Sequence, residues 1–125
     1  MFLATSNKAR QLLHVSYIGQ VHPAELAEGK EDIRALLAEL PQGFRLLTDF
    51  SQLMALDPDC LPEIGSIMEL LDQSGVGTIL RVIPAPEKDI GFNILTIFHY
   101  PHHPRVITCQ NLTEAGKHLA ELPAS

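Results

Sequence analysis

The chain has 125 residues, of which 46% are hydrophobic and 19% are charged, and its formal net charge is −6. This length is close to the commonest size of a single globular domain, and the composition excludes a disordered chain. The negative charge opposes a general attraction to nucleic-acid phosphates and anionic lipid, so we do not expect a nucleic-acid-binding protein.

The N-terminal segment has short apolar pieces that are interrupted by Asn7, Lys8 and Arg10. It lacks the continuous apolar stretch of a signal peptide or a membrane span, so we expect a cytoplasmic protein and not an integral membrane protein. The two cysteines, Cys60 and Cys109, form neither a CxxC pair nor a disulfide-dense pattern. We therefore expect both to be reduced thiols.

The first third of the chain predicts a hairpin of strands followed by a helix. Residues 12–18 have the alternating pattern of a strand, and residues 2–5 supply a shorter strand before them. We expect Gly19 to end the second strand. From residue 23 to residue 40, apolar side chains recur at intervals of three and four, which predicts a helix that is weakened at Gly29. The apolar stripe of this helix consists of Ile33, Leu36, Leu37 and Leu40.

The middle of the chain predicts a buried strand, a second helix and a further strand. Residues 44–50, FRLLTDF, form an apolar run that is typical of a strand buried on both faces of a parallel sheet. Pro62 is tolerated only in a first turn, so the following helix is expected to begin after about Pro58. Asp59 is then the best N-cap. The apolar face of this helix consists of Ile64, Ile67, Met68 and Leu71. The strand GTILRVIP follows at residues 77–84.

The last third of the chain predicts two more helices separated by a strand. The apolar residues after position 86 fit helix and strand spacing equally well, and the charged start PEKD favours a helix. Residues 105–109, RVITC, predict a strand. The segment NLTEAGKHLAEL predicts a helix with Asn111 as its N-cap and Glu114 three residues later, which is close to a capping box.

The alternation of these elements predicts an α/β fold. Strands that alternate with helices favour a mostly parallel sheet with right-handed crossovers. We expect a sandwich in which a mixed, mostly parallel sheet of about five strands packs with about four helices. The N-terminal hairpin supplies the antiparallel pair. Because no internal repeat or linker interrupts the sequence, residues 1–125 are expected to form a single domain.

The order of the elements resembles the STAS domain, the fold of the sporulation anti-sigma factor antagonist. The resemblance rests on this order and on the segment FRLLTDFSQLMALDPDC, which is followed by a helix and by GTILRVI. It covers nearly the whole chain and is greatest to short, stand-alone SpoIIAA-like proteins. It implies a non-catalytic regulatory domain that binds a protein partner and uses no cofactor.

The loop after the third strand departs from the pattern of this family. In the anti-sigma factor antagonists, a serine at the start of the next helix is phosphorylated by a partner kinase. When the family motif is placed on this sequence, its leading aspartate falls on Asp57, and Pro58 and Asp59 follow. Cys60 stands where the family has glycine. The resemblance therefore implies a regulatory domain that lacks the phosphorylatable serine.

The first candidate site is the segment from Asp49 to Cys60, which we expect to form a partner-binding loop. Its candidate residues are Asp49, Ser51, Asp57, Asp59 and Cys60. Carboxylates at the end of a parallel strand lie where open α/β sheets usually bind ligands. Asp59 would place a permanent negative charge near a helix N-terminus, where a phosphoserine carries about −1.5 to −2. The structural alternative is that Asp59 caps the helix while Asp49 or Asp57 braces the loop.

The second candidate site is an apolar patch in the segment DIGFNILTIFHY. This segment carries more apolar side chains than one helix requires, and such patches mark partner, ligand or self-association surfaces. Its candidate residues are Phe92, Ile97, Phe98 and Tyr100. The patch makes a carrier or sensor of a small, lipid-like ligand the alternative function, and it would also suit a homodimer interface. A further alternative is that these side chains belong to the core.

Catalysis and metal binding are not expected from the sequence. Three histidines, His99, His102 and His103, lie within HYPHHP, but the prolines favour a solvated turn and the spacing is not that of a structural zinc site. A helix N-terminus would activate the Cys60 thiol, whereas the neighbouring aspartates oppose a thiolate. The sequence contains no GxSxG, P-loop, HExxH or dinucleotide-binding motif. We therefore expect neither an enzyme nor a metal site.

Overall fold

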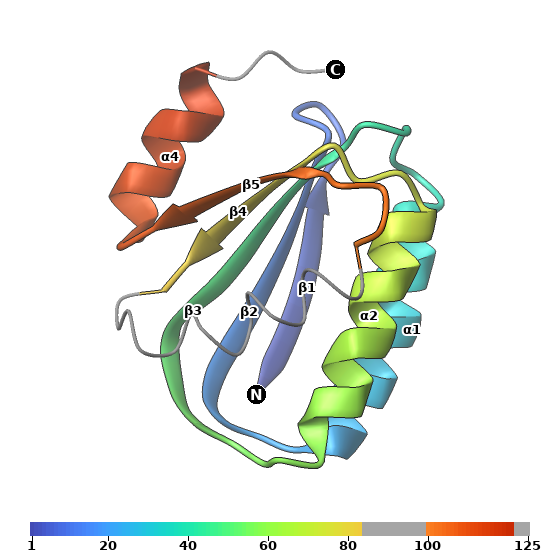
Figure 1. Cartoon of the computed structure of the whole chain (residues 1–125), viewed down its shortest axis with the longest axis vertical. Coiled ribbons are helices and arrows are strands. Elements are labelled where there is room, and N and C mark those ends of the chain that lie inside the picture. Colours follow the sequence, from blue (N-terminus) through green and yellow to red (C-terminus); the bar gives the residue numbers. More distant parts are fainter. Residues whose placement is uncertain (84–99, 122–125) are drawn as a thin grey trace.

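The computed structural model describes residues 1–83 and 100–121 (Figure 1). The helix expected from residue 86 onward lies outside these residues, as do Phe92, Ile97 and Phe98 of the apolar patch. None of the helices in the described part of the chain combines the length and the apolar character that crossing a bilayer requires.

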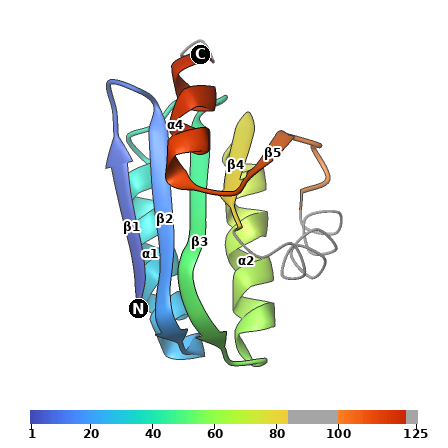
Figure 2. The same cartoon turned by 90° about the vertical axis from the view of Figure 1, so that its left-hand side faces the viewer.

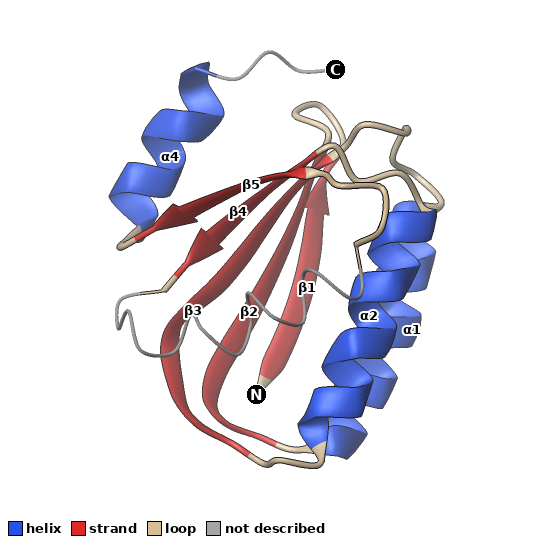
Figure 3. Cartoon of the chain, in the orientation of Figure 1, coloured by secondary structure: helices blue, strands red, loops and turns tan. Residues whose placement is uncertain are grey.

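A mixed five-stranded sheet forms the centre of the described residues (Figure 3). The first two strands pair antiparallel, and each later strand pairs parallel with the one before it, in the order β1-β2-β3-β4-β5. The strands are β1 (Phe2–Asn7), β2 (Leu12–Val21), β3 (Arg45–Leu56), β4 (Thr78–Val82) and β5 (Arg105–Cys109). The predicted mixed sheet and its antiparallel N-terminal hairpin are confirmed.

Helices cover both faces of this sheet. α1 (Pro23–Leu37) and α2 (Cys60–Gln73) pack side by side on one face, and α4 (Leu112–Glu121) lies on the other (Figures 1 and 2). These three helices are confirmed, and the fourth expected helix falls outside the described residues. α1 ends earlier than predicted, because the N–H of Leu40 bonds to the carbonyl of Leu37 in a tighter turn.

The core has two parts, one on each face of the sheet. Leu46 and Ile79 pack toward α1 and α2, while their chain neighbours Leu47 and Leu80 pack toward α4. Successive side chains of a strand point to opposite faces, so β3 and β4 are buried on both sides. This double burial explains their continuous apolar runs. The predicted stripe of α2, which is Ile64, Ile67, Met68 and Leu71, is buried throughout.

A buried arginine ties α4 to the sheet. Arg45, at the start of β3, is 4% exposed. Its Nη1 donates to the carbonyl oxygen of Leu119 in α4 at 3.1 Å, and its Nη2 donates to the carbonyl oxygen of Arg10 between β1 and β2. A cation near the last turn of a helix interacts favourably with the helix dipole. Arg45 therefore joins two segments that are distant in the sequence.

Both β2 and β3 are longer than predicted, and their pairing has two irregularities. At each one, β3 carries an extra residue relative to β2, which is the definition of a bulge. We expected Gly19 to end β2, but the strand continues to Val21. Gly19 has a φ of +64°, which glycine adopts without strain. The pairs on either side of the two bulges are Ser16 with Asp49, Ile18 with Gln52, Gly19 with Leu53, and Gln20 with Ala55.

Gly29 provides the space in which β1 packs against α1. A Cβ added at Gly29 would lie 2.2 Å from Cδ2 of Phe2. The ring of Phe2 also makes an edge contact with Tyr17, with 5.0 Å between the ring centroids. A glycine inside a helix costs about 1 kcal/mol relative to alanine. The close approach of the Phe2 ring explains why α1 carries this destabilising residue.

We predict that Gly29→Ala lowers the free energy of unfolding by about 1 kcal/mol, because displacing the Phe2 ring outweighs the gain in helix propensity. Gly116→Ala in α4 is the matched control, since nothing lies within 4 Å of the Cβ added there. This control should raise the free energy of unfolding by up to about 1 kcal/mol. Urea denaturation measures both changes, and a stabilised Gly29→Ala protein would contradict the proposed role of the glycine.

Candidate functional site

The candidate site lies at the edge of the sheet where β2 and β3 end and where α1 and α2 begin (Figure 1). The carboxyl ends of parallel strands are where α/β folds usually bind ligands. Between β3 and α2 the chain has only Asp57, Pro58 and Asp59. We call these three residues the acidic loop.

Asp57 stabilises the start of α2. Its Oδ1 accepts a hydrogen bond from the backbone N–H of Asp59 at 3.0 Å, and its carbonyl oxygen accepts one from the N–H of Cys60 at 2.8 Å. A helix-capping residue makes bonds of this kind. Pro58 follows at a position where proline is favoured, because the N–H it lacks would have no partner in the helix. Asp57 is therefore the residue that caps the first turn.

Asp59 directly precedes α2, as the sequence predicts, but its side chain makes no capping hydrogen bond. The residue is exposed. Of the structural alternative, the brace by Asp57 through a backbone N–H is confirmed. Asp59 occupies the N-cap position without the expected side-chain bond, and the side chain that bonds this turn is that of Asp57. The dipole of α2 favours a negative charge at this end. Asp59 thus presents its carboxylate on the surface of the molecule at the N-terminus of α2.

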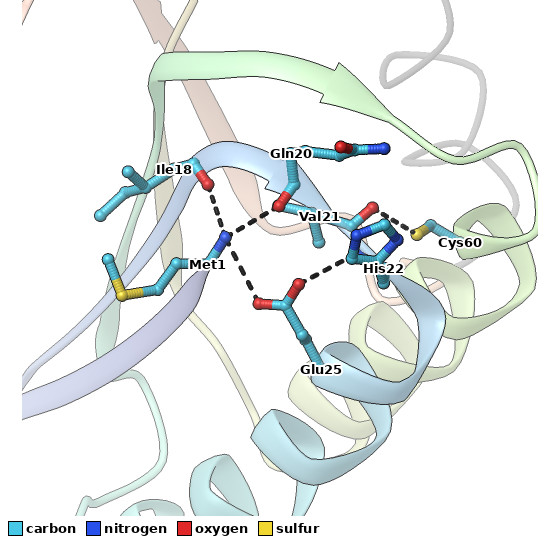
Figure 4. Close-up of polar contacts among 7 residues, drawn as sticks. All are labelled: Met1, Ile18, Gln20, Val21, His22, Glu25 and Cys60. Carbon is cyan, nitrogen blue, oxygen red and sulfur yellow. Dashed lines mark hydrogen bonds and ion pairs between the residues drawn. The ribbon is translucent and has the colours of Figure 1, made fainter.

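Cys60 is the first residue of α2 and is fully buried. Its Sγ donates a hydrogen bond to the carbonyl oxygen of Val21, at the end of β2, at 3.4 Å (Figure 4). Burial and the nearby charge of Asp57 raise the pKa of the Cys60 thiol. The side chain therefore joins α2 to β2 inside the fold, and it is not available to contact a partner.

Asp49 and Ser51 lie within β3 and not in a loop. Asp49 is buried, and its Oδ1 accepts a hydrogen bond from the backbone N–H of Ser51 at 2.8 Å. This bond coincides with the first bulge, so the carboxylate stabilises the irregular backbone there. The predicted loop from Asp49 to Cys60 is too long, because pairing with β2 keeps the chain in the sheet as far as Leu56. Asp49 shapes the strand, whereas Ser51 is exposed.

Two exposed apolar side chains flank the acidic loop along the chain, and sequence reasoning missed both. Met54 is 85% exposed and Leu61 is 45% exposed. Regular alternation from Phe50 would turn Met54 inward, but the extra residue of the bulge reverses the faces and buries Leu53 instead. The sequence signal that would have predicted the bulge is the consecutive polar pair Ser51 and Gln52 inside an apolar run. A regular strand would place only one of two consecutive residues on its outward face.

The start of α1 lies beside the acidic loop and has its own polar contacts (Figure 4). Oε1 of Glu25 accepts a hydrogen bond from the N–H of His22 at 3.2 Å, and Oε2 lies 3.3 Å from the amino group of Met1. The same amino group donates to the carbonyl oxygens of Ile18 and Gln20, at 2.6 and 3.0 Å. These contacts hold the end of β2 against the first turn of α1.

Tyr100 is the member of the predicted apolar patch that lies within the described residues, and it is buried in the core. Burial raises the pKa of its hydroxyl. Together with Tyr17 and Phe50, whose stacked rings lie 4.6 Å apart, it lines a cavity of about 30 Å³. A cavity of this size holds about one or two water molecules. Tyr100 therefore belongs to the core and is not part of an exposed interface.

A second polar cluster joins the segment before β5 to the end of α2. Nδ1 of His102 lies 2.6 Å from Oδ2 of Asp72, and the backbone N–H of His102 donates to Oδ1 of Asp72 at 3.2 Å. The carboxylate is buried, whereas the imidazole is 77% exposed. These two contacts to one carboxylate hold the segment before β5 against the end of α2. The sequence analysis placed this histidine in a solvated turn and did not predict its bonds to Asp72. The signal that was missed is an aspartate beside the apolar stripe of α2.

Comparison with known proteins supports the fold. No family model matches the chain, and no curated protein matches it. Among solved structures, the anti-sigma factor antagonist SpoIIAA in its unphosphorylated form has a TM-score of 0.65 at 14% identity, with 98% of this chain and 100% of that chain covered. An uncharacterized protein with a SpoIIAA-like fold from Shewanella loihica has a TM-score of 0.71 at 10% identity, with 95% and 92% covered.

A third similar structure is a complex of two proteins. A chain in the structure of the diguanylate cyclase SiaD with its activator SiaC from Pseudomonas aeruginosa has a TM-score of 0.60 at 12% identity, with 88% of this chain and 93% of that chain covered. These similarities show that the chain has the SpoIIAA-like, STAS-type fold. The fold that the sequence resemblance implied is thus confirmed.

We predict that Asp57→Ala lowers the free energy of unfolding by about 1 kcal/mol, because it removes the side-chain cap of α2. Asp59→Ala should change it by less than about 0.5 kcal/mol, as expected for an exposed residue without such a bond. Urea denaturation measures the free energy of unfolding of both variants and of the wild-type protein. Equal losses of stability would show that the two carboxylates do not have the separate roles described above.

Proposed function

We propose that the protein is a non-catalytic regulatory domain that binds a protein partner at the acidic loop. The observation that carries the proposal is the carboxylate of Asp59, which is exposed at the start of α2 and is not used as a helix cap. Buried Asp49 and Cys60 support the loop from inside the fold. Of the predicted site residues, Ser51, Asp57 and Asp59 are at least partly exposed and would contact the partner.

The apolar side chains beside the loop support a protein partner. Met54 is the most exposed of the large hydrophobic residues in the described part of the chain, and Leu61 lies in the first turn of α2. Methionine is frequent at adaptable binding surfaces, because its side chain is unbranched and polarisable. An apolar contact next to a carboxylate suits a partner that offers an apolar surface with a basic residue beside it.

The similar structures support regulation through protein contacts. SpoIIAA is described as an anti-sigma factor antagonist, and its structure is known in unphosphorylated and phosphorylated forms. SiaC is described as the activator of a diguanylate cyclase with which it forms a complex. Asp59 would act in this chain as a permanent charge near the position where the family carries a phosphate. A carboxylate has a smaller charge and fewer acceptor oxygens than a phosphate, so a partner would read a constant, weaker signal.

The surroundings of Cys60 support the absence of catalysis at this site. A cysteine nucleophile acts as a thiolate and must reach its substrate. Cys60 is fully buried, and burial raises the pKa of its thiol. The acidic loop therefore offers carboxylates for binding, with the exposed apolar side chains of Met54 and Leu61 on either side of it along the chain, and the adjacent Cys60 is not an activated nucleophile.

We predict that Asp59→Lys weakens partner binding at least about tenfold, because it reverses the charge at the N-terminus of α2. Asp32→Lys is the matched control, because Asp32 is also an exposed aspartate but lies within α1 and not in the acidic loop. Proteins crosslinked to each variant in the native lysate are quantified by mass spectrometry, and the recovered partner is then titrated in purified form. A partner that binds wild type, Asp32→Lys and Asp59→Lys equally would refute the role of the loop.

A carrier of a small apolar ligand remains the second candidate function, and the cavity beside Tyr17, Phe50 and Tyr100 favours it. Its volume of about 30 Å³ is far below the roughly 300 to 1,000 Å³ of small-molecule sites, so the cavity would have to widen. Native mass spectrometry of the purified protein separates the two functions. A bound lipid-sized molecule supports the carrier, and a ligand-free mass with retained partner binding supports the regulatory domain.

A further inference from the structure

Three side chains of metal-binding types converge where β5 meets α4. They are Cys109 at the end of β5 and Glu114 and His118 on α4, and their ligand atoms all lie within 4.8 Å of one another. Glu114 and His118 are four residues apart, so they share one face of the helix. The sulfur of Cys109 comes from a different element. The tertiary structure therefore brings together a thiol, a carboxylate and an imidazole.

The backbone around this cluster holds two of the three groups in place. The carbonyl oxygen of Cys109 accepts a hydrogen bond from the N–H of Ile83 at 2.8 Å, so the end of β5 is fixed beside β4. One carboxylate oxygen of Glu114, Oε2, accepts a hydrogen bond from the N–H of Gln110 at 3.1 Å. The N–H of Glu114 in turn donates to Oδ1 of Asn111 at 2.8 Å, which confirms Asn111 as the cap of α4.

We propose that Cys109, Glu114 and His118 bind one Zn²⁺ ion, with water as the fourth ligand. Thiolate and imidazole favour zinc over the hard cations Mg²⁺ and Ca²⁺, and three protein ligands with one open position are a common zinc arrangement. Ligand atoms around a tetrahedral zinc lie about 3.5 Å apart, as its bond lengths of about 2.0 to 2.3 Å require. Small rotations of Glu114 and His118, which are only partly buried, would close the remaining gap.

Zinc binding at this cluster requires that the thiol lose its proton. Burial and the charge of Glu114 raise the pKa of the Cys109 thiol, which opposes the thiolate while no metal is bound. As the zinc–sulfur bond forms, the proton leaves to solvent, and the charge of the metal offsets the negative charges of the thiolate and of Glu114. Binding of one Zn²⁺ therefore releases one proton from Cys109.

Zinc at this cluster would fasten α4 to the sheet. α4 covers the smaller part of the core through Ala115 and Leu119, and Arg45 holds its last turn. Of the zinc ligands, Cys109 lies on the strand that leads into α4, Glu114 lies in the first turn of α4 and His118 lies in its last turn. The metal would thus join both the first and the last turn of α4 to the end of β5, on the face of the sheet opposite α1 and α2. This role is separate from partner binding at the acidic loop.

The test uses the full chain without an affinity tag, freed of metal under reducing conditions. Zn²⁺ is titrated in competition with a chromophoric chelator, and Co²⁺ is added as a spectroscopic substitute. We expect one Zn²⁺ per chain, a higher melting temperature with added Zn²⁺, and a thiolate-to-cobalt charge-transfer band. His118→Gln and Glu114→Gln should each weaken zinc binding at least about tenfold. Glu114→Gln keeps an oxygen that can accept the bond from Gln110.

The control for the imidazole is His103→Gln, because His103 is an exposed histidine in the turn before β5. The control for the thiol is Cys60→Ala, which should keep the cobalt band, whereas Cys109→Ala should lose it. If Cys109→Ala fails to fold, the band in the wild-type protein still reports the thiolate ligand. The proposal is overturned if no metal binds, if the cobalt band is absent, or if His103→Gln weakens binding while His118→Gln does not.

Discussion

The pairing of β2 with β3 is the constraint on which the rest of this structure depends. Two extra residues on β3 are accommodated along this pair, one beside Ser51 and one beside Met54. The bulges bend β3 and keep its last residues in the sheet, and they reverse which side chains face outward. As a result, the connection to α2 is reduced to the acidic loop, and an exposed methionine stands just before it. A β3 without bulges would bury Met54 and expose Leu53.

Among the aspartates of the described residues, three bond the backbone through their carboxylates, whereas Asp32 and Asp59 are exposed and do not. Asp49 accepts a hydrogen bond from the N–H of Ser51, Asp57 from that of Asp59, and Asp72 from that of His102. Each carboxylate satisfies a donor that the regular ladders leave free, at a bulge, at a helix start and in a turn. Asp59 accepts no such bond among the described residues. Of the two exposed aspartates, Asp59 is the one at the N-terminus of α2.

The two faces of the sheet are covered by unequal parts of the core. The face toward α1 and α2 carries the larger part of the core, and the N-termini of both helices meet at the edge that holds the acidic loop. The opposite face is covered by the shorter helix α4, which depends on Ala115, Leu119 and the bond from Arg45. A metal at Cys109 would reinforce the weaker side. Binding and reinforcement would then occur on separate parts of one sheet.

The sequence by itself determined the order of the elements, the antiparallel hairpin, the apolar stripe of α2 and the cap of α4 at Asn111. These features depend on the spacing of residues within one segment, and the periods of the helix and the strand allow them to be predicted from that spacing. Only the tertiary structure decided that Asp57 caps α2, that Met54 is exposed and that Cys109 lies beside His118. Bulges and helix docking are set by contacts between residues far apart in the chain. The periodicity of residues within one segment does not indicate such contacts.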